Sequence, residues 1–292
     1  MGIKKVIISG LGALGVTYAN KFNTCCELKI LADAERIKKY KENPPTLNNK
    51  ELELNYINPE DNFEADLVII TTKSLGLNSV IRNLKNFVSE KTIIISLING
   101  ISSEETIKHA FPNSIVIRSF FIGHSAMREG NNVTQDGIGK IFIEKNDLLE
   151  DFFSKNNIDY EVSDDIIRAQ WIKLGVNIIL NQPSAIYELN VGALRNSENY
   201  LPLAKSLLKE VFNIAKAHGI NNLETYEQEV LKSIYLIADD GKTSMYQDVI
   251  AKRNTEVDIF SGEIIKLGKK YGIKTPYNED VYNRIKLKEA SF

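Results

Sequence analysis

Short apolar runs alternate with helix-like stretches through the first half of this chain, and this alternation constrains the fold more than any other feature. The runs lie at 6–8, 28–31, 67–70 and 93–95, with helical patterns at 16–22 and 77–88. Each run is too short for a core helix and is typical of a strand buried on both faces. Alternating strands and helices predict a parallel sheet with right-handed crossovers, an α/β fold.

The pattern changes twice further along the chain. From about residue 114, β segments at 115–117 and 139–143 follow closely, and we expect them to extend the sheet with antiparallel strands. After about residue 164 the periodicity is helical, with helix ends expected at Gly219 and Gly272 and a helix start at Thr275-Pro276. The chain therefore predicts an α/β domain over 1–163 and an all-helical domain over 164–292.

A glycine motif of the form G-x-G-x-x-G follows the first predicted strand directly and opens the first predicted helix. Its residues are Gly10, Leu11, Gly12, Ala13, Leu14 and Gly15. In this context the first glycine permits a tight turn, the second lets the backbone approach a pyrophosphate, and the third allows close helix–strand packing. The pyrophosphate would lie at the helix N-terminus. The motif predicts a Rossmann-like dinucleotide-binding domain; an ordinary turn with incidental glycines is the alternative.

Four polar residues are placed near this motif by the predicted topology. Asp33 follows the second strand, where a carboxylate accepts hydrogen bonds from both ribose hydroxyls and repels a 2′-phosphate, which favours NAD over NADP. Arg36 is close enough to reach a phosphate, or it is a solvated helix charge. Lys73 and Asn99 follow the ends of two further strands, where open α/β sheets bind ligands. Solvent-facing loop side chains are the alternative for both.

A polar stripe marks the most apolar helix of the second domain. Lys173, Asn177 and Asn181 recur at steps of four, and each step advances about 40° around a helix. The three side chains therefore share one narrow face, which predicts a polar cleft; a thin solvated edge is the alternative.

Two further segments look like helix starts. Ser244 and Gln247 have the spacing of a capping box, so Ser244 is either an N-cap or part of an anion site for a carboxylate. Glu256 and Asp258 both stand where an acidic residue offsets the helix dipole, and periodicity does not choose between them.

Charge and cysteine content exclude several classes of protein. With 36 basic and 38 acidic residues interspersed, the chain lacks the basic clusters of a nucleic-acid binder. The only cysteines, Cys25 and Cys26, are adjacent, too few for a zinc site and typical of a reducing compartment, so we predict no metal. No run approaches the roughly 18 apolar residues of a membrane span. We expect a cytoplasmic protein that binds neither nucleic acid nor membrane.

Together these motifs resemble those of the ketopantoate reductases (2-dehydropantoate 2-reductases) and, through them, the wider 6-phosphogluconate-dehydrogenase-like C-terminal superfamily. The resemblance spans nearly the whole chain. The blocks that carry it are 10–15, Thr72-Lys73, Asn99-Gly100, 171–174 with Asn177 and 181–183, 244–248 and 253–258.

The resemblance implies a role for each candidate residue. Lys173 would act as general acid, and Glu256, preferred over Asp258, would bind the substrate hydroxyl and contact the cofactor. Lys73 would contact cofactor and substrate. The substrate would be held by Asn99, Asn177, Asn181 and Ser244, with Asn99 also at the cofactor. These roles agree with the chemistry, because hydride transfer to a ketone leaves an alkoxide that needs a proton donor and hydrogen bonds.

The implied reaction is the NAD(P)H-dependent reduction of 2-dehydropantoate to (R)-pantoate, on the way to pantothenate and coenzyme A. Family members typically carry a basic residue where Asp33 stands, so the resemblance favours NADP(H) and Asp33 favours NAD(H). A paralogue acting on another 2-keto acid is the close alternative, and a non-catalytic dinucleotide sensor is the alternative from another class. We expect a monomer or a homodimer.

Overall fold

The computed structural model describes residues 2–123, 126–135, 137 and 139–292 of the chain. The chain divides into two compact units, 1–166 and 167–292. The boundary expected between residues 163 and 164 lies just ahead of this division, between the last strand of the first unit and the first helix of the second.

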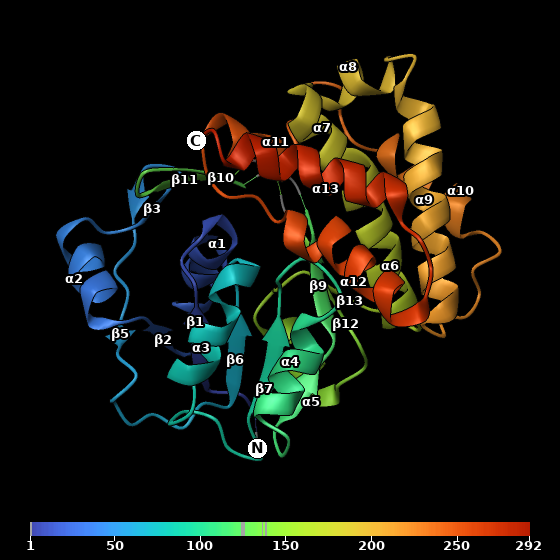
Figure 1. Ribbon diagram of the computed structural model, residues 1–292. Helices are drawn as coiled ribbons and strands as arrows, with labels where there is room; N and C mark the ends of the chain where they lie inside the picture. Colours follow the sequence, from blue (N-terminus) through green and yellow to red (C-terminus); the bar gives the residue numbers. More distant parts are fainter. Residues whose placement is uncertain (1, 124–125, 136, 138) are drawn as a thin grey trace. The chain divides into compact units, whose positions relative to one another are not determined.

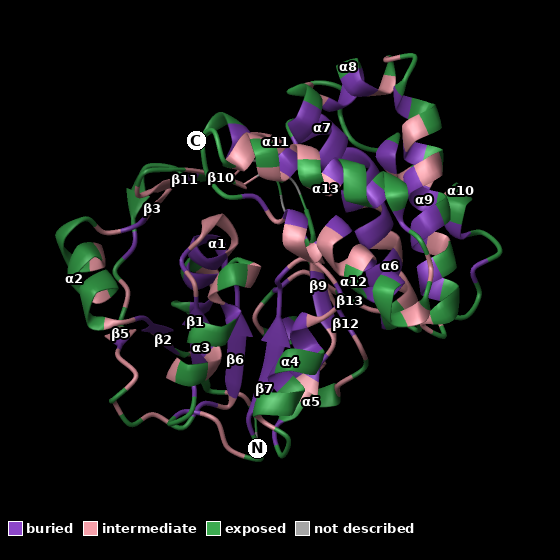
Figure 2. Ribbon diagram, in the orientation of Figure 1, coloured by how far each residue is buried: buried purple, intermediate pink, exposed green. Residues whose placement is uncertain are grey.

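The first unit is built on a six-stranded sheet in the order β5-β2-β1-β6-β7-β8, and every neighbouring pair is parallel. Its strands are β1 Lys5–Ser9, β2 Glu27–Leu31, β5 Tyr56–Ile57, β6 Leu67–Ile70, β7 Ile93–Ser96 and β8 Ile115–Ile117. In Figure 1, β2, β1, β6 and β7 follow one another in this order. All residues of β6 and β7 are buried (Figure 2), which explains their uninterrupted apolar sequences. The predicted parallel sheet is confirmed.

The expectation that residues 115–117 add an antiparallel strand is wrong. β8 pairs parallel with β7, because helix α4 (Ser103–Ala110) lies between them in the chain and provides the crossover that parallel neighbours need. The strand expected at 139–143 is also placed differently. It forms β12 (Lys140–Ile143) in a separate sheet, antiparallel to β9 (Ser119–Ile122).

The chain leaves the main sheet after β8 for a simple geometric reason. Only Arg118 separates β8 from β9, and a single residue is too short a link for a hairpin, so β9 cannot return antiparallel beside β8. Two small sheets result. One has the order β13-β12-β9, with β13 at Tyr160–Val162; the other has the order β10-β11-β3-β4, with strands Ala126–Glu129, Asn132–Gln135, Thr46–Leu47 and Lys50–Glu51. The Asn43-Pro44-Pro45 segment leads into β3 as a loop.

Helices cover the main sheet and supply the rest of the first core. They are α1 Ala13–Phe22, α2 Ala34–Glu42, α3 Leu77–Asn83, α4 and α5 Asp147–Lys155. Phe22 of α1 stacks on Phe152 of α5, with 5.8 Å between ring centroids, and both belong to the apolar core that includes β1 and β6. Val133 of β11 is fully buried in the same core. The sheet β10-β11-β3-β4, which we call the accessory sheet, is therefore packed into the first unit beside α1.

The second unit is helical throughout, as predicted. Its α-helices are α6 Ile166–Val176, α7 Gln182–Tyr187, α8 Val191–Arg195, α9 Tyr200–Ala217, α10 Tyr226–Ile234, α11 Ser244–Ile250, α12 Ser261–Tyr271 and α13 Pro276–Glu289. The predicted stop at Gly272 and the start at Thr275-Pro276 are confirmed, with Gly272 in the left-handed conformation at φ 68°. Trp171, Tyr226 and Phe260 fill the core.

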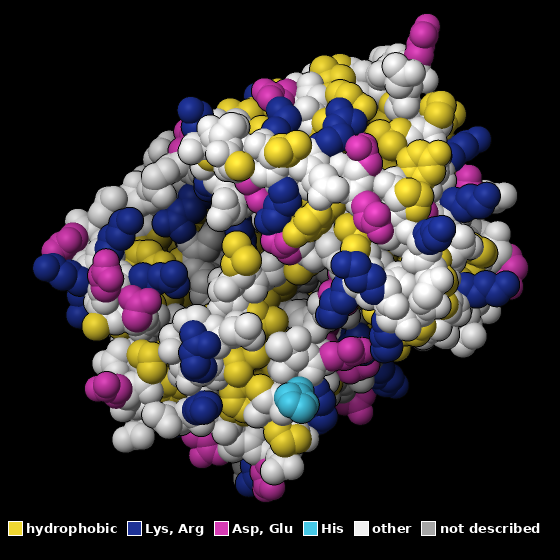
Figure 3. Space-filling model, in the orientation of Figure 1, with side chains coloured by type: hydrophobic (Ala, Val, Ile, Leu, Met, Phe, Trp, Pro, Cys, Tyr) yellow, Lys and Arg dark blue, Asp and Glu magenta, His cyan; other side chains and the backbone are white. Residues whose placement is uncertain are grey.

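Two surface properties bear on function. Among the described residues, no helix has both the length and the apolar character needed to cross a bilayer. On the face of the molecule shown in Figure 3, Lys and Arg side chains are interspersed with Asp and Glu side chains, in keeping with the net charge of −2.

Candidate functional site

Four of the predicted site positions lie at one edge of the parallel sheet. Gly10, Asp33, Lys73 and Asn99 follow the carboxyl ends of β1, β2, β6 and β7, respectively, and parallel strands bring these ends to the same edge. The strand order reverses between β1 and β6, which is where open α/β sheets bind ligands. Lys73 is exposed and Asn99 is half-buried.

The glycine loop is pressed against the loop that follows β6. Gly10 has φ +105°, and a Cβ atom there would lie 2.6 Å from the backbone nitrogen of Thr72. A Cβ at Gly15 would lie 1.9 Å from the carbonyl oxygen of Gly10. Thr71 fastens the two loops, since its Oγ1 donates to the Gly10 carbonyl at 2.6 Å. Gly10 and Gly15 are therefore required by packing of the backbone.

Gly12 has a different environment. The nearest atom to a Cβ built there is the Thr71 carbonyl oxygen at 3.8 Å, so the space beside Gly12 is open. Gly12 is the N-cap of α1, and among the described residues no side chain caps this helix and no acidic residue lies in its first turn. The first N–H groups of a helix have no partner within the helix, so they suit an anionic group. The loop thus fits the pyrophosphate of a dinucleotide.

Arg128, which the sequence did not single out, reaches the same loop. From β10 its Nη1 donates to the carbonyl of Leu11, and its Nε donates to the carbonyl of Gly130 at 2.9 Å. A guanidinium therefore lies against the glycine loop. No local pattern could have indicated this contact, because it depends on the accessory sheet packing beside α1.

Asp33 has a structural role in addition to its predicted one. It is the N-cap of α2: its Oδ1 accepts a hydrogen bond from the backbone nitrogen of Arg36 at 2.8 Å. The Arg36 Nε lies 3.5 Å from Asp33 Oδ2, and both side chains are at least half exposed. The carboxylate keeps acceptor capacity at the end of β2, and Arg36 is turned towards Asp33.

We expected the polar stripe of the second unit to lie on one continuous α-helix, but the helix is interrupted. Half-buried Lys173 belongs to α6, but Asn177–Asn181 forms a single π-helical turn before α7 begins. Pro183 gives the physical reason, because proline cannot donate to the preceding turn and its ring clashes with the carbonyl four residues back. Such π turns are frequent at functional sites.

The π turn brings three of the predicted substrate ligands together. Asn181 Nδ2 lies 3.3 Å from Asn177 Oδ1 and 3.4 Å from Ser244 Oγ. Asn177 and Asn181 are each 9% exposed, and Asn177 Nδ2 has no hydrogen-bond partner among the described residues. Leaving a buried donor unsatisfied is costly, so this cluster is suited to a ligand that accepts a hydrogen bond.

Ser244 is not the N-cap of its helix. Thr243 takes that position and its Oγ1 accepts from the backbone nitrogen of Tyr246 at 3.2 Å. Gln247 does not complete a capping box either, since its Nε2 donates to the Lys242 carbonyl at 3.0 Å. The capping interpretation failed by one residue because Thr and Ser are adjacent and equally suitable. Ser244 is thereby left exposed, with its hydroxyl near Asn181.

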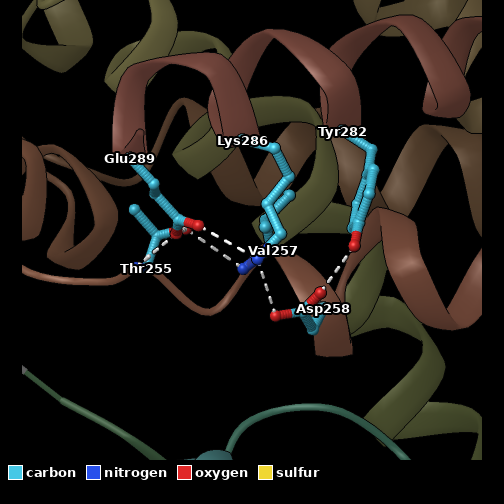
Figure 4. Close-up of polar contacts among 6 residues, drawn as sticks. All are labelled: Thr255, Val257, Asp258, Tyr282, Lys286 and Glu289. Atoms are coloured by element: carbon cyan, nitrogen blue, oxygen red, sulfur yellow. Dashed lines mark hydrogen bonds and ion pairs between the residues drawn. The ribbon is translucent and has the colours of Figure 1, made fainter. Parts of the chain in front are cut away.

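Asp258 and the segment around Glu256 are held by polar contacts from α13. Asp258 is engaged in the fold: Tyr282 donates to its Oδ1 at 2.8 Å, and Lys286 Nζ lies 3.1 Å from its Oδ2 (Figure 4). On the other side, Glu289 Oε1 accepts hydrogen bonds at 2.7 Å from both the backbone nitrogen and the Oγ1 of Thr255. Contacts from α13 thus hold the chain on both sides of half-buried Glu256.

Lys286 lies between two carboxylates, Asp258 and Glu289, and the opposite charges stabilise one another. Burial lowers the pKa of Lys286, but hydrogen bonds to Glu289 and Asp258 outweigh it and raise the pKa above its ordinary value. The pKa of Tyr282 is raised chiefly by its hydrogen bond to Asp258, so its hydroxyl stays a donor. Both donors, Lys286 and Tyr282, therefore remain protonated at neutral pH.

A Rossmann-type unit with a glycine loop at the carboxyl edge of its sheet, joined to an all-helical unit, defines a class of protein: the NAD(P)-dependent oxidoreductases. The chain belongs to the ketopantoate reductase family. The family described as "Ketopantoate reductase PanE/ApbA" matches residues 6–147, and "Ketopantoate reductase PanE/ApbA C terminal" matches residues 165–289.

Relatives with a curated name are similar to this chain over most of their length. A 2-dehydropantoate 2-reductase of Streptococcus pyogenes serotype M6 is 25% identical over 300 residues, which cover 98% of each chain. Another, from Pyrobaculum aerophilum, is 29% identical over 228 residues, which cover 78% of each chain.

Solved structures share the fold. A D-mandelate dehydrogenase, solved with NADH and anilino(oxo)acetate, is 25% identical and has a TM-score of 0.88 over 98% of this chain and 99% of that one. A PanE/ApbA family ketopantoate reductase from Ralstonia eutropha JMP134 is 23% identical, with a TM-score of 0.86 over the same shares. A dimeric ketopantoate reductase from Staphylococcus aureus is 24% identical, with a TM-score of 0.80 and again the same shares.

Proposed function

We propose that this chain reduces 2-dehydropantoate to (R)-pantoate with a nicotinamide dinucleotide, a step towards pantothenate and coenzyme A. The observation that carries the proposal is the buried cluster of Asn177 and Asn181 with Ser244, in which Asn177 Nδ2 has no hydrogen-bond partner among the described residues. The family and the relatives named 2-dehydropantoate 2-reductase support the same reaction.

The first unit would hold the cofactor, which supplies a hydride to the 2-keto carbon when bound. The backbone N–H groups at Gly10–Gly15 would bind the pyrophosphate, and the guanidinium of Arg128 adds positive charge beside this loop. Asp33 would accept hydrogen bonds from the adenosine ribose. Lys73, Asn99 and Glu256 are the further residues that we propose to contact the cofactor.

Lys173 would supply the proton. Reduction of the ketone generates negative charge on its oxygen, and a positioned ammonium both stabilises that charge and neutralises it by proton transfer from Nζ. Lys173 and Asn177 are four residues apart, which places neighbouring side chains on one side of a helix. The Asn177 amide would then donate to the substrate oxygen atoms.

Glu256 would recognise the 4-hydroxyl group of the substrate. A carboxylate held in place accepts a hydrogen bond from a 4-hydroxyl group, and a substrate without that group leaves the carboxylate unpaired. The contacts that α13 makes to Thr255 and Asp258 restrict the motion of the intervening residue and so support this role.

Two features support different cofactors. Asp33 favours NADH, and the D-mandelate dehydrogenase of similar fold was solved with NADH. The resemblance to ketopantoate reductases favours NADPH, for which Arg36 is the nearest basic residue to Asp33 on α2. Cytoplasmic location is supported by the free thiols of Cys25 and Cys26. The dimeric relative supports a homodimer.

A second candidate is a reductase of another 2-keto acid. The D-mandelate dehydrogenase supports it, because that protein has the highest structural similarity quoted above together with 25% identity. A non-catalytic dinucleotide sensor is a weaker candidate, since a sensor needs neither Lys173 nor the asparagine cluster.

The test is the initial rate of NADH and NADPH oxidation with matched 2-keto acids. We expect turnover with 2-dehydropantoate and a much lower kcat/KM with 3,3-dimethyl-2-oxobutanoate, which differs by lacking the 4-hydroxyl. Preference for phenylglyoxylate over 2-dehydropantoate would replace the proposed substrate with an aromatic one. Dinucleotide binding without turnover of any of the three acids would favour the sensor.

A further inference from the structure

A chain of buried polar side chains lies behind the π turn, and the proposed reaction does not use it. Its members are Gln182 (0% exposed), Ser261 (0%), Asn278 (0%) and Glu210 (7%). They come from α7, α12, α13 and α9, so segments distant in the sequence meet at this point. Buried polar groups of this kind cost stability unless their hydrogen bonds are satisfied.

The hydrogen bonds form an unbroken path. Gln182 Nε2 donates to Ser261 Oγ at 2.8 Å, and Gln182 Oε1 accepts from the Ser261 backbone nitrogen at 3.2 Å. Ser261 Oγ donates to Asn278 Oδ1 at 2.7 Å, and Asn278 Nδ2 donates to Glu210 Oε2 at 2.8 Å. Each member therefore has its orientation fixed by the next.

The first member of the path also contacts the π turn. Gln182 Nε2 donates to the carbonyl oxygen of Ile178 at 3.2 Å. In a continued π register this carbonyl would accept from the backbone of residue 183, which is Pro183 and has no N–H. The side chain of Gln182 thus replaces a backbone donor that the sequence has removed.

We propose that Gln182 is a positioning residue that fixes the π turn and thereby orients Asn177 and Asn181 towards the substrate. Without the amide of Gln182, the Ile178 carbonyl has no donor from residue 183, and the turn can relax towards other helical registers. A change of register rotates the asparagine side chains away from one another. The proposal rests on the proposed function of the two asparagines as substrate ligands.

Helix α13 extends the same positioning to Glu256. Glu210 accepts hydrogen bonds from the backbone nitrogens of Tyr277 and Asn278, at 2.9 and 3.0 Å, and so anchors the first turn of α13. The last turns of α13 carry Lys286 and Glu289, which hold the segment around Glu256. One helix therefore ties the two proposed parts of the substrate site together.

The test compares Gln182→Met, which keeps the length of the side chain and removes its hydrogen bonds, with Gln228→Met on the exposed face of α10 as a control. We expect Gln182→Met to raise the KM for 2-dehydropantoate about tenfold or more, with the Kd for the dinucleotide unchanged. The control should change neither. An unchanged KM in a folded Gln182→Met protein would overturn the proposal and leave Gln182 a purely structural residue.

A second measurement separates this proposal from the proposed reaction. Hydrogen exchange of the backbone amides at 177–182, measured without substrate, should be faster in Gln182→Met while α9 keeps its protection. Equal protection in the two proteins would overturn the proposal even if the enzyme is active. Lack of turnover by the wild-type protein would refute the proposed function and leave this measurement intact.

Should Gln182→Met fail to fold, Ser261→Ala serves the same purpose. It removes the hydroxyl that orients the Gln182 amide and keeps the contact between Gln182 and Ile178. We expect a smaller rise in KM, about threefold, and unchanged dinucleotide affinity. An unchanged KM in this variant, together with unchanged exchange at 177–182, would also count against the path.

Discussion

Two parts of the proposed sites differ in what they are built from: the pyrophosphate loop of the first unit is made by backbone, and the asparagine cluster of the second unit is made by side chains. At the sheet edge, the decisive features are the φ of Gly10, the contact of Gly15 with the Gly10 carbonyl and the open space at Gly12. In the helical unit they are the amides of Asn177 and Asn181, oriented by buried residues of other helices.

This difference determines how each site responds to change. A backbone site depends on the absence of side chains at a few positions, so adding one methyl group is enough to damage it. A side-chain site depends on hydrogen-bond partners contributed by several helices, so it can be weakened at a distance. The following experiments test this contrast, from the largest expected effect to the smallest.

Replacing Lys173 by Met should have the largest effect. The effect should fall on kcat and not on the affinity for the dinucleotide. Loss of a general acid lowers kcat by roughly 10²- to 10⁴-fold. The Kd for NADH or NADPH, measured by quenching of protein fluorescence, should stay the same. Lys216→Met, at an exposed position of α9, is the control. A Lys173→Met protein that kept more than a tenth of its kcat would contradict the assignment.

Gly12→Ala and Gly10→Ala should separate binding from folding within one loop. At Gly12 a methyl group meets no protein atom closer than 3.8 Å, so thermal stability should hardly change, while the dinucleotide Kd rises about 10- to 100-fold. At Gly10 a methyl group would lie 2.6 Å from Thr72 nitrogen, and we expect a loss of roughly 1–3 kcal/mol of stability. Calorimetric unfolding and titration with ADP-ribose measure the two quantities. Equal losses of affinity and stability in both variants would remove the distinction.

Asp33→Ser should alter the choice of cofactor with a moderate effect. Removing the carboxylate removes its repulsion of a 2′-phosphate, so the ratio of kcat/KM for NADPH to that for NADH should rise about tenfold. Serine can still cap α2, which keeps the helix start intact. The same ratio in both proteins would show that Asp33 does not contact the ribose.

The ion pair between Arg168 and Glu229 should make a small, pH-dependent contribution to the stability of the second unit. The Arg168 guanidinium, hydrogen-bonded to Glu229 at 2.6 Å, lowers the pKa of that carboxyl group, with a further contribution from Thr225. A lowered pKa in the folded state stabilises the protein at pH values above the ordinary Glu pKa, which is near 4.3. This stabilisation is lost as the pH falls through the pKa of the folded state.

Because the Glu229 side chain is 39% exposed, the contribution should be at most about 1 kcal/mol. We expect Glu229→Gln to destabilise at pH 7 and to approach wild-type stability below about pH 4. Urea unfolding at several pH values measures this contribution, with Glu227→Gln, at an exposed position of α10, as the control. A destabilisation that stays constant down to pH 3 would exclude the ion pair as its cause.

The backbone site could be predicted from sequence because its requirements are local. A tight turn and a close approach need glycines at fixed spacing, and the preceding strand and following helix lie within a few residues of them. The four central strands of the main sheet, β2, β1, β6 and β7, were equally accessible, since strands buried on both faces have continuous apolar sequences. The two-residue strands β3, β4 and β5 escaped prediction, because two residues show no periodicity.

The side-chain site was predicted only in part. The spacing of Asn177 and Asn181 indicated a shared face, but the π turn depends on Pro183 together with an amide that replaces the missing donor. The choice of Glu256 over Asp258 came from a family resemblance. The contacts that Tyr282 and Lys286 of α13 make to Asp258 could not be foreseen, because they join residues that are 24 and 28 positions apart in the sequence.

The pairing of β3 with β11 determines how early the accessory sheet can form during synthesis. Thr46 of β3 pairs with Asn132 of β11, 86 residues later, so β3 leaves the ribosome long before its partner exists. At roughly 5–20 residues per second, the wait is about 4–17 s. The accessory sheet, and the burial of Val133 in the core that includes α1, can therefore form only after this delay.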